Sequence, residues 1–154
     1  MIESFPLGKA VGDRAAELFT SGLNCAESVL QANMEYFKVE GDWFPRVATG
    51  FGAGIAQAGL VGGVVTGAVM AAGWVLGRDT PTESRDELYA LLAEFMGDFA
   101  RERGSITCID LIGLDFSDPA MRARARQERL FETTCVPLVA YGAAHIAEML
   151  SPQA

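Results

Sequence analysis

The residues best suited to chemistry in this sequence are its three cysteines: Cys25, Cys108 and Cys135. Each directly follows a residue type that commonly caps a helix, in the pairs Asn24-Cys25, Thr107-Cys108 and Thr134-Cys135. This order predicts that each thiol occupies the first position of a helix, where unpaired backbone N–H groups and the helix dipole favour a negative charge. A thiolate attacks electrophiles and binds soft metals. We therefore interpret all three cysteines as candidate catalytic or metal-binding residues, with simple core packing as the alternative.

Spacing along the chain adds nothing to this interpretation. The cysteines lie 83 and 27 residues apart, with no CxxC pair and no zinc-finger interval, so only the fold can bring them together. The single histidine, His145, is expected to be a half-buried packing residue, and no serine motif supports a hydrolytic triad. An odd number of cysteines and a charged start without an apolar leader, Met1 to Phe19, predict a reducing, cytoplasmic location.

The element expected to position these residues is an uncharged stretch of 29 residues, Thr49 to Gly77, which holds nine of the 17 glycines. A stripe of small residues recurs in it at every fourth position: Gly59, Gly63, Gly67 and Ala71. From Gly62 or Gly63 the stretch is predicted to form a central helix that neighbours approach closely. That helix is short for a membrane span, which requires about 20 residues. The preceding GFGAG segment lacks the lysine and spacing of a phosphate loop.

The rest of the chain predicts a single all-α domain, 1–154, of about six or seven helices, because apolar residues recur at helical spacing and never alternate for long. The other predicted segments are Leu7–Phe19, Asn24–Phe37, Trp43–Val47, a helix that starts at Thr80-Pro81 and ends at Gly104, a short turn from Cys108 to Ile112, an arginine-bearing helix capped by Asp118-Pro119, and Thr134–Leu150.

Composition narrows the classes of partner. Half of the residues are hydrophobic and 21% are charged, which is typical of a globular protein, and the net charge of −8 argues against nucleic acid and anionic membranes. One short segment is basic, and we interpret it as a solvated helix face that also carries Glu128: Arg122, Arg124, Arg126 and Arg129.

Several segments follow one another in a recognisable order: Gly22-Leu23-Asn24-Cys25-Ala26, Gly50-Phe51-Gly52-Ala53-Gly54, Gly62-Gly63-Val64-Val65-Thr66-Gly67-Ala68, Gly104-Ser105-Ile106-Thr107-Cys108 and Cys135. Together they resemble a family of small redox-active proteins, labelled C_GCAxxG_C_C, that carry four cysteines, one of them in a CGAxxG motif. The resemblance runs from about Leu18 to Leu150 and implies a helical fold with a redox or metal-binding role. Gly62 stands where the motif has its cysteine, and Val64 where it has alanine, so a four-thiolate site is not intact here.

Two hypotheses of different classes follow. In the first, the three cysteines converge beside Gly62 and Gly63, which would border a cofactor. The pocket would hold a soft metal or iron–sulfur cluster, or would undergo reversible oxidation with a redox partner. In the second, a non-catalytic protein has lost the site and binds a small ligand or a partner helix, with self-association as a homodimer. A membrane-embedded dimer through Gly59, Gly63 and Gly67 ranks last.

Overall fold

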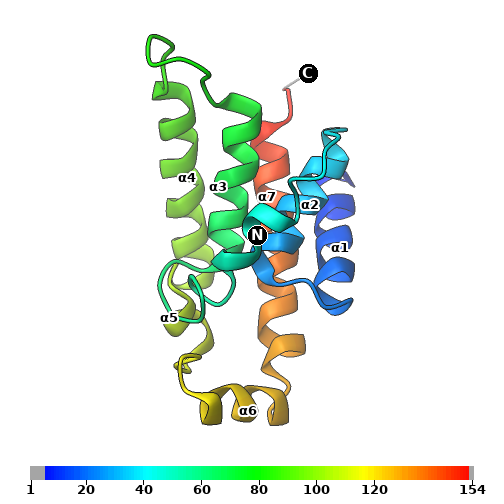
Figure 1. The fold of residues 1–154 in the computed structure, drawn as a ribbon, viewed down its shortest axis with the longest axis vertical. Coiled ribbons are helices and arrows are strands. Elements are labelled where there is room, and N and C mark those ends of the chain that lie inside the picture. Colours follow the sequence, from blue (N-terminus) through cyan, green and yellow to red (C-terminus); the bar gives the residue numbers. More distant parts are fainter. Residues whose placement is uncertain (1–5, 153–154) are drawn as a thin grey trace.

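Seven α-helices and two short helical segments make up the regular structure of residues 6–152, the part of the chain that the computed structural model describes (Figure 1). The α-helices are α1 (Pro6–Thr20), α2 (Cys25–Tyr36), α3 (Gly63–Leu76), α4 (Asp86–Arg103), α5 (Cys108–Ile112), α6 (Pro119–Gln127) and α7 (Val136–Leu150). A 3-10 helix, Arg46–Phe51, lies between α2 and α3, and a π-helical turn, Phe131–Cys135, leads into α7. No strand forms within residues 6–152, so the predicted all-α class is confirmed.

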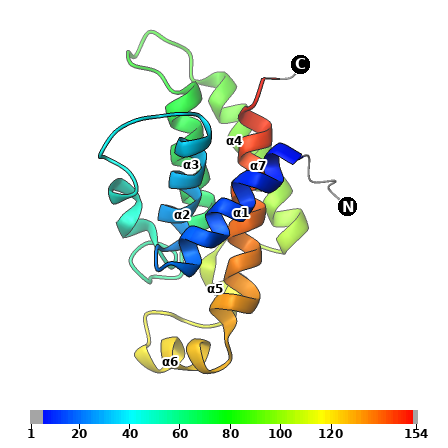
Figure 2. The ribbon, with the colours of Figure 1, turned by 90° about the vertical axis from the view of Figure 1, so that its right-hand side faces the viewer.

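The longer helices pack around a shared apolar core. Helix α7 contacts α1, α2, α3 and α4, and α3 lies between α2 and α4. Figure 2 shows α1 lying against α7, with α6 at one end of the molecule. Phe95 and Phe99 of α4 are fully buried against α3 and α7, as the apolar spacing of that helix predicts. Burial of these large side chains is a main source of stability in such a bundle.

Helix α3 approaches α2 at backbone distance through two glycines. A Cβ atom placed on Gly67 would lie 2.7 Å from the carbonyl oxygen of Ala26, and one on Gly63 would lie 2.9 Å from the Ala26 nitrogen. The predicted close packing is therefore confirmed at these two positions. The prediction is wrong for Gly59, which precedes the helix, has a φ of +74° and packs against Ile109 instead. The face at Gly63 and Gly67 is covered by α2 of the same chain, so it is not free to form a dimer.

Local capping signals correctly located several helix ends. Asn24 and Glu27 form the predicted capping box at the start of α2, and the Asp118 carboxylate accepts the Ala120 N–H at the start of α6. Gly104 ends α4 in the left-handed conformation, with a φ of +92°.

Two predicted segments are wrong in position. Helix α4 begins at Asp86 and not at Thr80-Pro81, because the glutamate of the apparent capping box bonds elsewhere. The Glu83 carboxylate accepts the Asp79 N–H, and Arg78 donates to carbonyl groups of the same loop, so these residues fasten a turn. The segment predicted at Trp43–Val47 is found further along, as the 3-10 helix Arg46–Phe51.

No single helix among the described residues is both long enough and apolar enough to cross a membrane. Two consecutive segments, Pro119–Gln127 and Phe131–Leu150, meet that length and composition only together, and they are bent by 77° relative to each other.

The close approach of α3 to α2 generates a test of stability. Gly67→Ala should lower the free energy of unfolding by about 1–3 kcal/mol, because the new methyl group would overlap the Ala26 backbone, which cannot move aside as a flexible side chain can. Urea denaturation followed by circular dichroism measures the difference.

Gly73→Ala is the matched control on the same helix. Nothing lies within 4 Å of a Cβ atom placed at Gly73, so this variant should be neutral or more stable by up to about 1 kcal/mol through helix propensity. Equal effects of the two substitutions would show that the α2–α3 contact does not require glycine at position 67.

Candidate functional site

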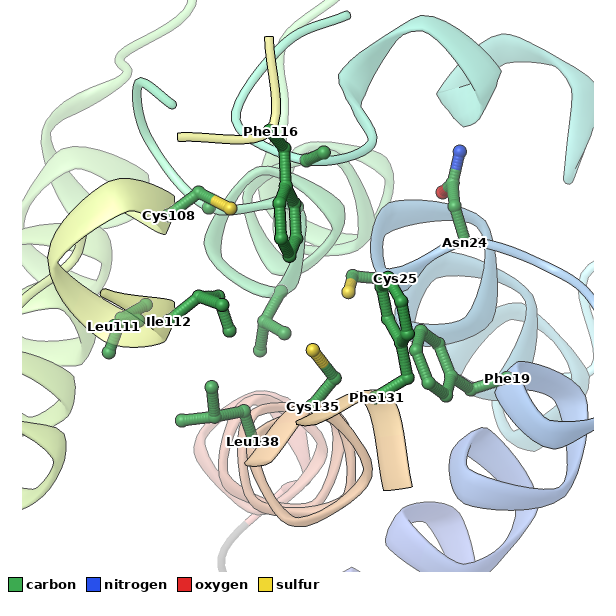
Figure 3. Close-up of a pocket in the computed structure, with 14 residues that line it drawn as sticks. Phe19, Asn24, Cys25, Cys108, Leu111, Ile112, Phe116, Phe131, Cys135 and Leu138 are labelled. Atoms are coloured by element: carbon green, nitrogen blue, oxygen red, sulfur yellow. The ribbon is translucent and has the colours of Figure 1, made fainter. Parts of the chain in front are cut away.

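All three cysteines line one cavity of about 110 Å³ at the meeting point of α2, α3, α5 and α7. Figure 3 shows the three sulfur atoms directed toward the same space, with Phe116 and Phe131 among the side chains around it. The described lining is apolar apart from the thiols and Asn24, and it includes no charged residue: Phe19, Asn24, Cys25, Ala53, Gly62, Gly63, Val64, Cys108, Leu111, Ile112, Phe116, Phe131, Cys135 and Leu138. The predicted convergence beside Gly62 and Gly63 is therefore what the structure shows, whereas the chemical role of these residues stays a prediction.

Cys25 is held at the first position of α2 by hydrogen bonds that tie this helix to the following loop. The Asn24 side chain accepts the Glu27 N–H at 2.9 Å, and Glu27 accepts the Asn24 N–H at 2.9 Å. The Asn24 amide also donates to the Thr49 carbonyl at 2.9 Å, and the Thr49 hydroxyl donates to Glu27 at 3.0 Å. These four bonds restrict how Cys25 can enter the pocket.

Gly63 brings α3 against Cys25, and Gly62 leaves open space. A Cβ atom on Gly63 would lie 3.1 Å from the Cys25 Cβ, so a larger residue would push the two helices apart. Gly62 has an ordinary extended backbone, with a φ of −62° and a ψ of 146°. A Cβ atom there would make only ordinary contacts, the nearest at 3.5 Å from the Ile106 oxygen and the Leu111 Cδ1. A side chain at position 62 is therefore sterically acceptable.

Cys108 begins α5, as predicted, but its surroundings do not favour a thiolate. Its backbone N–H donates to the Leu60 carbonyl at 2.7 Å in a short antiparallel contact between the segments around Val61 and Thr107, and Thr107 makes no side-chain cap bond. Burial, followed by the negative charge of Cys135, raises the pKa of Cys108 to about 11. The prediction of an activated thiol at this helix start is wrong, because an N–H that could have stabilised charge is already bonded and desolvation outweighs a single helical turn.

Cys135 does not open the last helix, which corrects a second prediction. The π-helical turn Phe131–Cys135 precedes it, and the Val136 N–H bonds back to the Phe131 carbonyl, so the helical run starts earlier than the Thr134 cap signal indicates. The pKa of Cys135 is nevertheless lowered, chiefly because the Cys25 thiol donates a hydrogen bond to it, while burial and the charge of Glu132 oppose the shift.

The pKa of Cys25 is shifted in the opposite direction from that of Cys135. The hydrogen bond to Cys135, followed by burial, raises the pKa of Cys25 well above its ordinary value. The hydrogen bond therefore runs from the Cys25 thiol to the Cys135 sulfur, and Cys135 is the member of the pair that ionises first. Hydrogen bonding between thiols, and not the helix dipole that the sequence suggested, produces the one activated sulfur.

Comparison with known proteins identifies a family for this chain. A family model described as "Putative redox-active protein (C_GCAxxG_C_C)" matches residues 23–149. The chain belongs to this family. No curated protein and no solved structure matches it significantly. The three cysteines of the pocket all fall within the matched residues, as does Gly62.

A metal or iron–sulfur role within this family depends on whether the residues fit such a group. Within residues 6–152, no three histidine, cysteine, aspartate or glutamate side chains are placed so that they could hold one metal ion. Three free thiols line the pocket, but a hydrogen bond relates only Cys25 and Cys135, and Gly62 supplies no donor side chain. The residues present therefore do not fit a metal or an iron–sulfur cluster, and no step below passes through one.

Two features of this family member were missed at the sequence level. Phe116 and Phe131 flank α6, pack with ring centroids 5.6 Å apart and close one side of the pocket. Arg122, grouped above with a solvated face, instead donates to the Phe116 carbonyl, whereas Arg124 and Arg126 are exposed. Aromatic residues on both sides of a short helix were the only available signal.

The second missed feature is a left-handed turn beside Cys108. Ala53, Gly54, Ile55, Ala56 and Gln57 have φ values of 52°, 71°, 66°, 48° and 71°. Four of these five residues carry a Cβ, and each non-glycine residue in this conformation costs roughly 1–2 kcal/mol. The turn lets Ala53 line the pocket and brings Gly54 against Cys108. Only its glycines hinted at an unusual backbone.

The different pKa shifts of the three thiols predict an order of reactivity. Alkylation of Cys135 by iodoacetamide should increase with pH through a midpoint below the ordinary thiol value of 9.0, while Cys108 should require a pH near 11. In Cys25→Ala the midpoint for Cys135 should move upward, because the hydrogen-bond donor is gone. Peptide mass spectrometry after timed quenching provides the rates.

Cys108→Ala is the control for this experiment. Cys108 makes no contribution to the lowered pKa of Cys135, so the midpoint should not move. A wild-type profile in which all three cysteines react with one common midpoint near 9 would contradict this order of reactivity.

Proposed function

We propose that Cys25 and Cys135 form a reversible dithiol–disulfide couple, through which this protein accepts and returns two electrons. The observation that carries the proposal is geometric: the sulfur atoms of Cys25 and Cys135 point toward one another in one apolar pocket (Figure 3). The opposite pKa shifts of the two thiols agree with a hydrogen bond from Cys25 to Cys135. The family description as redox-active agrees with a thiol couple and specifies no reaction.

The forward step begins with attack of the Cys135 thiolate on an electrophilic acceptor. A bond forms between Cys135 and one atom of the acceptor, the bond from that atom to its leaving group breaks, and the leaving group departs with the bonding pair. Cys135 is now an uncharged mixed adduct. The hydrogen bond and the charge that raised the pKa of Cys25 are therefore lost, although burial still raises it. The proton of Cys25 passes to the departed leaving group. The Cys25 thiolate attacks the Cys135 sulfur, the bond from Cys135 to the bound acceptor atom breaks, and that atom departs with the bonding pair. The Cys25–Cys135 disulfide remains, and the two halves of the acceptor have together gained two electrons.

Cys108 has a different position in this scheme. Burial and the negative charge of Cys135 raise the pKa of Cys108 to about 11, so Cys108 keeps its proton at neutral pH. Among the described contacts, no hydrogen bond links Cys108 to either of the other sulfurs. We assign it to the wall of the pocket, with no electron transfer of its own.

The proposal is tested by equilibrating the protein with mixtures of reduced and oxidised dithiothreitol, then alkylating and mapping the disulfides by mass spectrometry. Wild-type protein should form one disulfide, between Cys25 and Cys135, and lose it again in excess reductant. Cys108→Ser should show the same couple, whereas Cys25→Ser and Cys135→Ser should form no intramolecular disulfide. Circular dichroism establishes that each variant is folded.

Two results would overturn the proposal. One is a Cys108–Cys135 disulfide as the main product in wild-type protein, since that would make Cys108 the partner. The other is stoichiometric iron or zinc in protein purified without oxygen, together with its loss in each single cysteine variant. If a substituted protein fails to fold, disulfide mapping of wild-type protein alone still decides between the pairings.

A further inference from the structure

We propose that the oxidant of this site is a small, uncharged organic hydroperoxide, which Cys135 reduces to the alcohol and Cys25 resolves. This inference rests on the proposed thiol couple and adds the class of its substrate. The apolar walls of the pocket, its size and the Cys25 thiol beside Cys135 each favour such an oxidant.

The walls select against charged oxidants. No charged side chain is among the described lining residues, and the one polar side chain, Asn24, already has its amide groups bonded to Glu27 and Thr49. A charged disulfide such as oxidised glutathione would lose its hydration without gaining a partner, at a high cost in free energy. An apolar group, by contrast, gains from leaving water for these walls.

The size of the pocket selects against bulky disulfides. An apolar cavity of about 150 Å³ in another protein takes up benzene. A cavity of about 110 Å³ therefore suits a group somewhat smaller than that ring. A disulfide substrate places substituents on both sulfurs, and it needs room for both in line with Cys135. A hydroperoxide carries a single substituent and reacts at its terminal oxygen.

The position of the proton matches the chemistry of the O–O bond. The Cys135 thiolate attacks the terminal oxygen, the O–O bond breaks, and the leaving alkoxide takes the proton of Cys25 and departs as an alcohol. Cys135 is now a sulfenic acid and Cys25 a thiolate. The Cys25 thiolate attacks the Cys135 sulfur and expels hydroxide, which takes a proton from solvent to give water. The hydroperoxide has gained two electrons and the two thiols have lost them.

The experiment compares four oxidants on the reduced full-length protein at pH 7: tert-butyl hydroperoxide, hydrogen peroxide, 2-hydroxyethyl disulfide and oxidised glutathione. Rates of Cys25–Cys135 disulfide formation are divided by the rates for free cysteine with the same oxidant. We expect the ratio for tert-butyl hydroperoxide to exceed that for hydrogen peroxide at least tenfold, and both disulfides to lie below it. One tert-butanol should appear per disulfide formed.

Substitutions then test whether the pocket causes the preference. Ile112→Phe places a larger side chain in the lining and should slow the reaction with tert-butyl hydroperoxide more than the reaction with hydrogen peroxide. Ile109→Phe is the matched control, because Ile109 lies on the same helix, is 42% exposed and is absent from the lining. In Cys25→Ser, tert-butyl hydroperoxide should leave a sulfenic acid on Cys135 that dimedone traps.

The outcomes separate this inference from the thiol couple itself. If the disulfide forms in dithiothreitol mixtures but tert-butyl hydroperoxide shows no advantage over hydrogen peroxide, the couple stands and the hydroperoxide inference is overturned. A higher normalised rate for 2-hydroxyethyl disulfide would overturn it in favour of disulfide exchange. If no Cys25–Cys135 disulfide forms under any condition, both proposals fail.

Discussion

The contact between the backbones of α2 and α3 is the constraint on which the site depends. Ala26 lies against both Gly63 and Gly67, and it directly follows Cys25, so the depth at which α3 sits sets where that sulfur enters the pocket. The capping box at Asn24 holds Cys25 from the other side. The Asn24 side chain accepts the Glu27 N–H and donates to the Thr49 carbonyl, so the start of α2 is tied to the following loop. A protein of this size obtains such precision from short backbone contacts, since longer side chains between the helices would allow several packings.

The helix ends that could be predicted correctly from the sequence are those set by residues close together in the chain. The capping box at Asn24, the Asp118-Pro119 start and the Gly104 end each involve residues within one helical turn, and each is found. Features that depend on distant contacts were not predictable. The start at Thr80-Pro81 failed because Glu83 and Arg78 bond within the loop, and the start at Thr134 failed because a π-helical turn begins at Phe131.

The candidate site shows the same division between local and distant effects. Its cysteines could be named from residue type and position after a capping residue, but the helix-start argument gave the wrong reason for activation. Neither Cys108 nor Cys25 has a lowered pKa, and the sulfur that does, Cys135, lies at the end of a π-helical turn. Its activation requires Cys25, which is distant in sequence, to point a thiol at it, and that arrangement exists only after folding.

The low polarity of the pocket limits how many of its three thiols can be ionised at the same time. With no charged residue in the described lining, each additional negative charge would raise the cost of burial and repel the others. A cluster of four thiolates needs a cation to offset that cost, and Gly62 removes the fourth. The hydrogen bond from the Cys25 thiol offsets part of that cost for Cys135 alone, and the pKa of this one thiol is lowered.

Two irregular segments of backbone, the π-helical turn and the left-handed turn, both border this pocket. Since such conformations persist only where the surrounding contacts hold them, we interpret this wall as shaped for a ligand beside the thiol pair and not merely to complete the core.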